Sequence, residues 1–266
     1  MVYDEVVLRM EEITKRFPGV LANDRISLDC RKGEVLGLLG ENGAGKTTLM
    51  SILYGLHQPN SGRIFINGEA VKIENPAKAI QLGIGMVHQH FKLVDALTAL
   101  ENVILGMPLE HPPVLDLAAA RARLLSLCEE YDLYVDPSTE VWRLPVGKQQ
   151  WLEILKALYR DAKLLVLDEP SSVLTPDEGE QLFRAIRKLT QEGRAVIFIS
   201  HKLGEVVEIT NRITVIRDGH VVGTVPTKEA TTRELGRLMV GRPVSLDRKS
   251  RPAITKKEPV LVMEHV

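Results

Sequence analysis

The feature that most constrains the fold is the segment Gly40-Glu41-Asn42-Gly43-Ala44-Gly45-Lys46-Thr47, which matches the pattern G-x-x-x-x-G-K-[ST] of a phosphate-binding P-loop. The apolar run Val35–Leu39 precedes it and is typical of a buried parallel strand. Residues 47–53 follow as the first turns of a predicted helix. Glycines allow such a loop to curl until its backbone N–H groups converge on phosphate oxygens, and the helix N-terminus adds partial positive charge. The pattern therefore predicts a strand–loop–helix unit that binds phosphate.

Two side chains of this motif have distinct expected roles. Lys46 would reach the β- and γ-phosphates of a bound nucleotide, where its charge makes it a candidate catalytic residue. The Thr47 hydroxyl is a candidate ligand of Mg²⁺. An accidental glycine-rich turn is the alternative, but the flanking strand and helix argue against it. The loop residues expected to bind nucleotide are Gly40, Glu41, Asn42, Gly43, Ala44, Gly45, Lys46, Thr47 and Thr48.

Composition limits the classes of protein to consider. The chain has 266 residues, enough for one large domain or two small ones. Its 34 Lys and Arg residues balance 35 Asp and Glu residues, so bulk charge does not favour nucleic acid or an anionic membrane as a partner. Cys30 and Cys128 lack metal-binding spacing, which predicts reduced thiols. The N-terminus has no signal-peptide core and no apolar run reaches the ~20 residues of a membrane helix, so we expect a soluble chain.

Hydrophobic periodicity places a helical segment, about residues 90–160, between two strand-rich segments. Residues 5–40 are predicted to form strands around a turn at Pro18-Gly19, and 62–68 a strand that ends in an Asn-Gly turn. The order predicts an α/β core with antiparallel strands beside it. The other expected elements are helices over 46–57, over 117–131 with Asp116 as its cap, over 149–160 and near 178–189, strands over 164–167 and 195–200, and a hairpin over 213–223 around Asp218-Gly219.

Two carboxylates and a histidine end two predicted core strands. Asp168 is placed to hold Mg²⁺, and Glu169 to polarise an attacking water as general base. An acidic pair after a strand is more often a helix cap, but its pairing with a P-loop favours nucleotide chemistry. His201 ends the next strand, and parallel strands place their carboxyl ends at one edge, so His201 is expected to contact the γ-phosphate or the attacking water. A purely structural histidine is the alternative.

Gln89 and Phe17 are further candidates. The Gln89 amide can ligate Mg²⁺ or hold the water, and it stands just before the helical segment. His88 and His90 flank it, which leaves a zinc site as an alternative without an evident third ligand. Phe17 precedes the Pro18-Gly19 turn and is expected to stack on adenine, with an ordinary strand-end core residue as the alternative.

Taken together, these motifs resemble the ATPase subunits of ABC transporters, in order and spacing, over nearly the whole chain. The segment from Gly85 to Gly106 looks most like the importers of nucleosides and simple sugars, in which one polypeptide carries two ATPase domains in tandem. The motifs that carry the resemblance are the P-loop, Gln89, Leu144-Pro145-Val146-Gly147-Lys148-Gln149-Gln150, Leu167-Asp168-Glu169-Pro170 and His201.

The resemblance implies a P-loop NTPase fold of the ABC-ATPase type, with a mainly parallel core sheet, an antiparallel β part and a helical subdomain. It implies an ATPase domain over residues 1–241, a linker over 242–258 and the start of a second such domain over 259–266. The last seven residues match residues 7–13 at four of seven positions, which fits that reading, although coincidence is the alternative over so short a stretch. This chain would then be the first half of the tandem.

The implied activity is ATP hydrolysis with ATP and Mg²⁺, coupled to import at the cytoplasmic face of a cell membrane as a peripheral subunit. Two domains would sandwich two ATP molecules between P-loop and signature segment, and Gln89 would link nucleotide state to the membrane subunits. The implied partners are a second ATPase domain, integral membrane permease subunits and, indirectly, an extracytoplasmic substrate-binding protein, with no nucleic acid. The rival class is a soluble tandem ABC ATPase that acts on ribosomes or DNA, but the chain lacks a heptad run or basic patch. An inactive binding module would require loss of Lys46 or Glu169, and both are present.

The signature segment departs from the family pattern. Pro145 stands where a serine would donate to the γ-phosphate of the nucleotide held by the facing domain, and proline has neither a side-chain donor nor an N–H. Lys148 replaces a usual Gln or Glu, and Thr175 replaces the usual aspartate of the Ser172–Thr175 loop. The signature residues expected to contact that nucleotide are Pro145, Val146, Gly147, Lys148 and Gln149.

Overall fold

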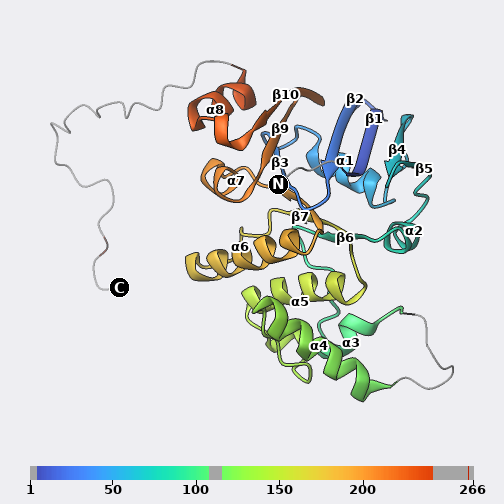
Figure 1. Ribbon diagram of the computed structural model, residues 1–266, viewed down its shortest axis with the longest axis vertical. Coiled ribbons are helices and arrows are strands. Elements are labelled where there is room, and N and C mark those ends of the chain that lie inside the picture. The colour runs from blue at the N-terminus through green and yellow to red at the C-terminus, as the bar shows by residue number, and fades with distance from the viewer. Residues whose placement is uncertain (1–4, 108–115, 242–262, 264–266) are drawn as a thin grey trace.

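The computed structural model describes residues 5–107, 116–241 and 263, and its strands form two sheets (Figure 1). A six-stranded sheet has the order β10-β9-β3-β8-β7-β6, and a four-stranded antiparallel sheet has the order β2-β1-β4-β5. The strands are β1 (Val6–Phe17), β2 (Val20–Arg31), β3 (Val35–Leu39), β4 (Ser61–Ile66), β5 (Glu69–Val71), β6 (Ile84–Val87), β7 (Leu164–Asp168), β8 (Ala195–Ile199), β9 (Arg212–Arg217) and β10 (His220–Pro226).

The helices cover both faces of the six-stranded sheet. Short 3₁₀ turns lie at Val141–Arg143 and Thr227–Glu229. The α-helices are α1 (Lys46–Leu53), α2 (Pro76–Gln81), α3 (Ala99–Ile104), α4 (Leu117–Tyr131), α5 (Val146–Tyr159), α6 (Pro176–Gln191), α7 (Leu203–Ile209) and α8 (Thr232–Val240).

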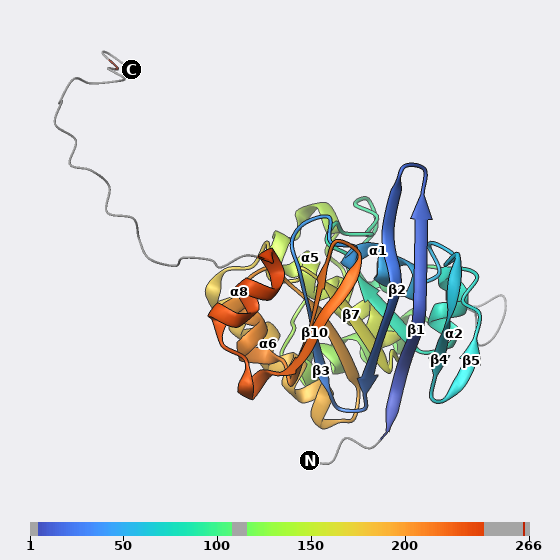
Figure 2. The ribbon, with the colours of Figure 1, turned by 90° about the horizontal axis from the view of Figure 1, so that it is seen from above.

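Strands β9, β3, β8, β7 and β6 run parallel, and β10 pairs antiparallel with β9. Every residue of β3, β6, β7 and β8 is buried, because the sheet is covered on both sides. Alternate residues of a strand therefore enter different cores: Leu165 and Leu167 pack with α5 and α6, whereas Val166 packs with α1 and the antiparallel sheet. Figure 2 shows β1 and β2 standing beside the core sheet, on the side away from α6 and α8.

The helical segment lies at one end of the molecule. Helices α3, α4 and α5 gather below α6 in Figure 1, at the end opposite the antiparallel sheet. Asp116 caps α4 as predicted, since its carboxylate accepts from the backbone N of Ala119 at 2.9 Å. Both predicted glycine turns are present, with φ of 50° at Asn67 and 50° at Asp218, each followed by a glycine of positive φ.

Three helices have boundaries that differ from the sequence prediction. Helix α1 ends at Leu53, not at residue 57, because Gly55 adopts φ 78° and the N of Leu56 bonds back to the O of Ser51. Helix α5 begins at Val146, three residues before the predicted start, since Pro145 occupies its N-cap. Helix α6 spans Pro176–Gln191, two residues longer at each end than predicted, because a Thr175–Glu178 capping box begins it.

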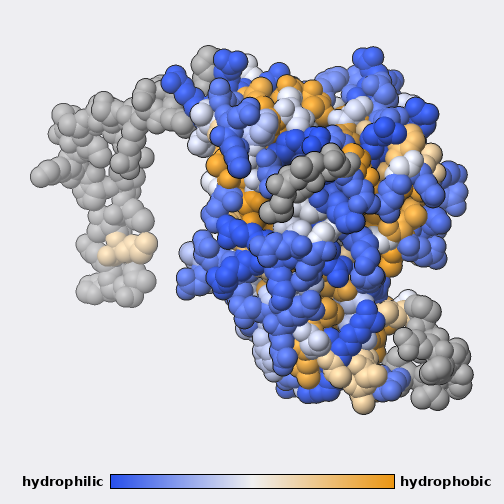
Figure 3. All heavy atoms as spheres, in the orientation of Figure 1, coloured by the Kyte–Doolittle hydropathy of each residue, from blue (hydrophilic) through white to orange (hydrophobic). Residues whose placement is uncertain are grey.

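On the face shown in Figure 3, hydrophilic residues predominate over α6, and hydrophobic side chains emerge in separate places. In the part of the chain that the structure describes, none of the helices has the length and apolar character needed to cross a bilayer. The predicted linker over 242–258 and the predicted second domain over 259–266 lie outside the described residues, apart from Met263.

Candidate functional site

The candidate residues meet at one edge of the parallel sheet. The P-loop follows β3, His201 follows β8, Asp168 ends β7 and Gln89 follows β6. These four strands are consecutive neighbours in the sheet and run in the same direction, so their carboxyl ends lie side by side. This is the edge at which open α/β sheets bind ligands.

Lys46 lies inside the P-loop. Its Nζ donates to the carbonyl oxygens of Gly40 at 2.8 Å and Glu41 at 2.9 Å, and the residue is only 6% exposed. Burial lowers the pKa of Lys46, while the charges of Glu169 and Asp168 act in the opposite direction. The ammonium group is thus placed within the loop that would surround a phosphate.

Gly45 shows why the loop requires glycine. Its φ is 102°, and a Cβ there would lie 2.3 Å from the carbonyl oxygen of Ala22. Its own carbonyl accepts from Asn23 Nδ2 at 3.0 Å. The start of β2 therefore packs so closely against the P-loop that position 45 has no space for a side chain.

Thr47 and Asp168 form a pair of oxygen donors. The Thr47 hydroxyl donates to Asp168 Oδ2 at 3.2 Å. Asp168 is 3% exposed, and its pKa is raised, first by burial and then by the negative charge of Glu169, with the Thr47 hydrogen bond acting against this. Hydroxyl and carboxylate oxygens are ligands that Mg²⁺ prefers, so the residues present fit the predicted metal.

Glu169 is held from two sides. His201 Nδ1 lies 2.9 Å from Glu169 Oε1, and Gln89 Nε2 donates to Glu169 Oε2 at 3.4 Å. The Glu169 side chain is 13% exposed and that of His201 48%. The acidic pair does not cap a helix, because Thr175 caps the next one. A carboxylate in this setting can accept a proton from a water.

A cavity of about 670 Å³ brings these groups together. Five of its lining residues were not predicted as ligand contacts, since Ala22 and the Asp218-Gly219 turn belong to segments whose sequence signals indicate only strand and turn. They reach the P-loop through tertiary contacts, such as the bond from Gly219 N to Ala44 O at 3.2 Å. The lining residues are Phe17, Val20, Leu21, Ala22, Asn42, Gly43, Gly45, Lys46, Thr47, Thr48, Gln89, Asp168, Glu169, Asp218 and Gly219.

Phe17 lies at the mouth of this cavity, half-buried at the end of β1. Its ring meets that of His57 edge-on, with centroids 5.3 Å apart, and Lys15 Nζ lies 5.0 Å from its centroid. The ring thus takes part in an aromatic contact and also borders the cavity, where a flat base can stack.

The signature segment lies elsewhere, at the N-terminus of α5, and none of its residues lines this cavity. Pro145 is the N-cap of α5 and makes no side-chain cap bond. Gln149 Nε2 donates to the carbonyl of Leu144 at 3.0 Å, and Gly147 packs against the Glu178 carboxylate that caps α6. The helix N-terminus is exposed at Val146, so it is free to meet a partner molecule.

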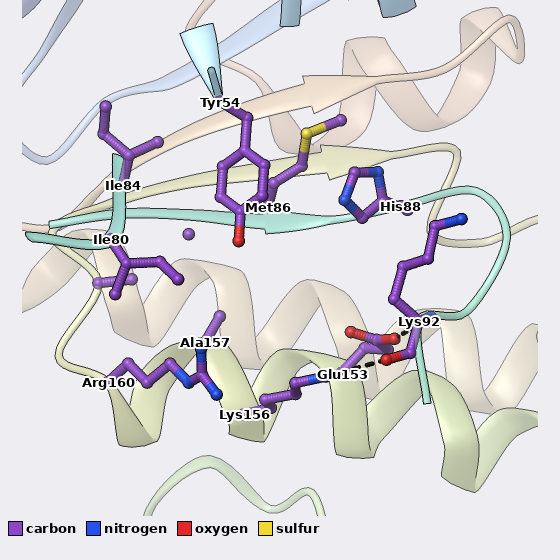
Figure 4. Close-up of a pocket in the computed structure, with 12 residues that line it drawn as sticks. Tyr54, Ile80, Ile84, Met86, His88, Lys92, Glu153, Lys156, Ala157 and Arg160 are labelled. Atoms are coloured by element: carbon purple, nitrogen blue, oxygen red, sulfur yellow. Dashed lines mark hydrogen bonds between the residues drawn. The ribbon is translucent and has the colours of Figure 1, made fainter. Parts of the chain in front are cut away.

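A second, smaller cavity of about 180 Å³ lies between β6 and α5 (Figure 4). Glu153 of α5 accepts from the backbone N of Lys92 at 2.5 Å, and Lys156 Nζ donates to the Lys92 carbonyl at 3.0 Å. Burial raises the pKa of Glu153. His88 points into this cavity and meets the Tyr54 ring at 5.7 Å, and its pKa is lowered, mainly by burial. Among the described residues no three His, Cys, Asp or Glu side chains gather as a metal site, so the zinc alternative has no support there.

A P-loop at the carboxyl edge of a parallel sheet, with strand-end carboxylates facing its lysine and threonine, defines a P-loop nucleotide-binding protein. The model of the ABC transporter family matches residues 23–172, more than half of the chain, and the protein belongs to this family.

Several characterised proteins are similar to this chain. It is 49% identical over 91% of its length to the nucleoside import ATP-binding protein NupA of Lactococcus lactis, and 46% identical over 98% of its length to the glucose import ATP-binding protein TsgD13 of Haloferax volcanii. It covers 48% and 52% of those proteins, so the chain spans about half the length of the curated relatives it matches.

Solved structures share the fold. The ADP conformation of MJ1267, an ATP-binding cassette of an ABC transporter, superimposes with a TM-score of 0.77 at 24% identity, over 89% of this chain and 99% of that one. The dimeric structure of MJ0796, a bacterial ABC transporter cassette, gives a TM-score of 0.74 at 25% identity, over 83% and 98% of the two chains. The predicted family and fold class are thereby confirmed.

Proposed function

We propose that this chain is an ATP-binding and ATP-hydrolysing cassette that powers an ABC importer for nucleosides or simple sugars. The observation that carries the proposal is the convergence of Lys46, Thr47, Asp168 and Glu169 on one cavity, with His201 in contact with Glu169 just outside its lining. The names of the similar import proteins support the transported class, which ranges from glucose to nucleosides and guanosine among them.

The chain's own residues suit hydrolysis of a phosphate anhydride. The P-loop and Lys46 would bind the phosphates of ATP, and Thr47 with Asp168 would hold Mg²⁺, which supplies charge neutralisation when bound. Glu169 would take the proton of the attacking water, oriented by His201 at 2.9 Å and Gln89 at 3.4 Å. Each group therefore acts by positioning or by charge, as phosphoryl transfer requires.

The proposed partners follow from exposed parts of the site. The signature segment at the start of α5 would complete a nucleotide site on a second ABC ATPase domain, and the dimeric cassette to which this chain is similar supports such pairing. Because Pro145 offers no hydrogen-bond donor there, the backbone N–H groups of Val146 and Gly147 would have to serve instead.

We place the membrane permease contact at the β6–α5 cavity. This cavity includes His88, the neighbour of Gln89, and Gln89 donates a hydrogen bond to Glu169. A permease segment bound in the cavity would therefore contact the chain next to the nucleotide site. Ile84 and Met86 line its β6 side, and Lys156 and Arg160 line the opposite side, at α5 (Figure 4). The protein would act peripherally at the cytoplasmic face, with an extracytoplasmic substrate-binding protein as an indirect partner.

Nucleotide titration tests the proposal. Lys46→Ala should weaken Mg-ATP binding at least about tenfold, because a charge-assisted contact to phosphate contributes roughly 1.5–3 kcal/mol. Lys163→Ala is the matched control, since this lysine is 63% exposed and, among the described residues, its ion pair is with Asp161 alone, outside the cavity. Equal ATP affinity in Lys46→Ala and the parent would refute the P-loop assignment. Co-purification with ribosomes in place of membrane permeases would favour a soluble ABC ATPase.

A further inference from the structure

A buried polar cluster lies directly behind the Glu169–His201 pair. Ser171 is 6% exposed and Ser200 is 2% exposed. Both hydroxyls donate to the same oxygen, Oε2 of Glu205 in α7, at 2.5 Å and 3.3 Å. Buried hydroxyls need acceptors, and Glu205 serves both.

The second oxygen of Glu205 is also engaged. Lys202 Nζ donates to Glu205 Oε1 at 2.8 Å and lies 3.4 Å from the carbonyl oxygen of Ser171, while the backbone N of Lys202 donates to Ser200 Oγ at 3.0 Å. The cluster thus includes Ser200 and Lys202, which flank His201 in the sequence. It joins them to Ser171, two positions after Glu169.

The backbone alone does not connect these two loops. The β7–β8 ladder ends at the pairing of Asp168 with Ile199, followed by a last bond from Glu169 N to Ile199 O at 3.0 Å. Beyond that point the loops that carry the Glu169 and His201 side chains are joined by side chains. Glu205 bridges the two loops through both serines.

We propose that Glu205 is a positioning residue that holds His201 against Glu169 in the geometry needed for hydrolysis. This inference rests on the proposed ATPase function. Glu205 is not among the residues that line the nucleotide cavity, so its effect would pass through His201 and Glu169. Misplacing a catalytic group by about 1 Å can cost about 100-fold in rate.

The kinetic test compares variants of the 266-residue chain. Glu205→Ala should lower kcat for ATP about tenfold to 100-fold and leave the KM and the Mg-ATP affinity within about twofold, since Lys46 and Thr47 are untouched. Glu205→Gln keeps one acceptor oxygen and should retain an intermediate kcat. Glu208→Ala is the matched control on the same helix, because Glu208 is 44% exposed and its ion pair within the described part of the chain is with Arg187 alone. It should behave like the parent.

A second readout is independent of activity. The ¹⁵N signal of His201 Nδ1, assigned by its loss in His201→Gln, reports the contact with Glu169. It should shift in Glu205→Ala and stay in place in Glu208→Ala. If Glu205→Ala fails to fold, the double variant Ser171→Ala with Ser200→Ala removes the two hydroxyl bonds to Glu205, keeps its pairing with Lys202, and should give the same shift.

The outcomes separate the two proposals. A parent that fails to bind Mg-ATP would contradict the proposed function, whereas the His201 signal would still decide the role of Glu205. An unchanged His201 signal in Glu205→Ala, or an unchanged kcat in an active parent, would overturn the positioning role. A loss of kcat with a matching loss of Mg-ATP affinity would also overturn it, because that pattern indicates general damage to the site.

Discussion

Glu169 has a φ of 51°, in the left-handed region that such residues seldom adopt. The turn separates two adjacent carboxylates: Asp168 faces Thr47 and Glu169 faces His201. Unusual backbone conformations of this kind cost about 1–3 kcal/mol and persist where the surroundings hold them. Here the bond from Glu169 N to Ile199 O and the two side-chain contacts hold the residue. Under the proposed function, one strand end thereby supplies both a metal ligand and a proton acceptor.

The variant Glu169→Gln tests that division at the residue scale. The amide keeps the size of the side chain but cannot take up a proton, so ATP binding should persist while hydrolysis falls by at least about 100-fold. Single-turnover hydrolysis measures the effect, with Glu208→Gln as a control acid outside the cavity. An undiminished cleavage rate would reassign the proton acceptor to His201 or another group.

At the scale of elements, α5 lies close against β6 because Gly85 has no side chain. A Cβ at Gly85 would come within 2.8 Å of the Cβ of Ala162 and 3.0 Å of the Cβ of Ala157. Small residues on both sides therefore set the separation of helix and strand. This contact matters for the site, since β6 ends two residues before Gln89 and α5 begins at the signature segment.

Gly85→Ala should therefore destabilise the protein by about 1–3 kcal/mol, because added volume between packed elements forces them apart. Urea unfolding measures the change. Gly179→Ala is the control: nothing lies within 4 Å of its added Cβ, and alanine in a helix is favoured over glycine by about 0.5–1 kcal/mol, so that variant should be more stable. Equal stability of Gly85→Ala and the parent would show that α5 can move away freely.

At the scale of the whole molecule, Arg212 ties the two sheets together. Its guanidinium, at the start of β9, bonds Asp29 Oδ2 of β2 at 2.7 Å and Glu34 Oε1 at 2.9 Å, next to β3. Glu34 is 3% exposed, and the Arg212 guanidinium pairs with its buried carboxylate. Burial acts to raise the pKa of Asp29, but the hydrogen bond and charge of Arg212 outweigh it, and that pKa is lowered from 3.8.

Arg212→Ala should lower the free energy of unfolding by about 3–5 kcal/mol, since it leaves a buried carboxylate unpaired. Arg187→Ala, which breaks an exposed pair with Glu208, should cost at most about 1 kcal/mol. Because the pKa of Asp29 is lowered in the folded state, its ionised carboxylate stabilises the fold above pH 3.8. This stabilisation is lost as the pH falls through the folded-state pKa. The difference in free energy of unfolding between parent and Arg212→Ala should therefore become smaller below about pH 4, as measured by acid unfolding. If this difference in free energy of unfolding does not change with pH, Asp29 does not contribute to it.

Features that depend on short stretches of chain can be predicted from the amino-acid sequence. The P-loop, the carboxylates after β7 and the turns at Asn67-Gly68 and Asp218-Gly219 could be predicted because each requires particular residue types at fixed local spacing. Helix boundaries depend on more than local spacing: a proline is compatible with several positions near a helix start, so the fold assigns Pro145 to the N-cap of α5.

Contacts between residues that are far apart in the sequence follow from the tertiary structure alone. Ala22 closes over Gly45, Glu205 joins the loops of Glu169 and His201, and Arg212 bonds Asp29 across 183 positions of the chain. None of these residues stands in a recognisable local pattern. Their roles arise because the parallel sheet aligns its strand ends and the antiparallel sheet packs against it, which brings together groups whose separation in sequence carries no information about their distance in space.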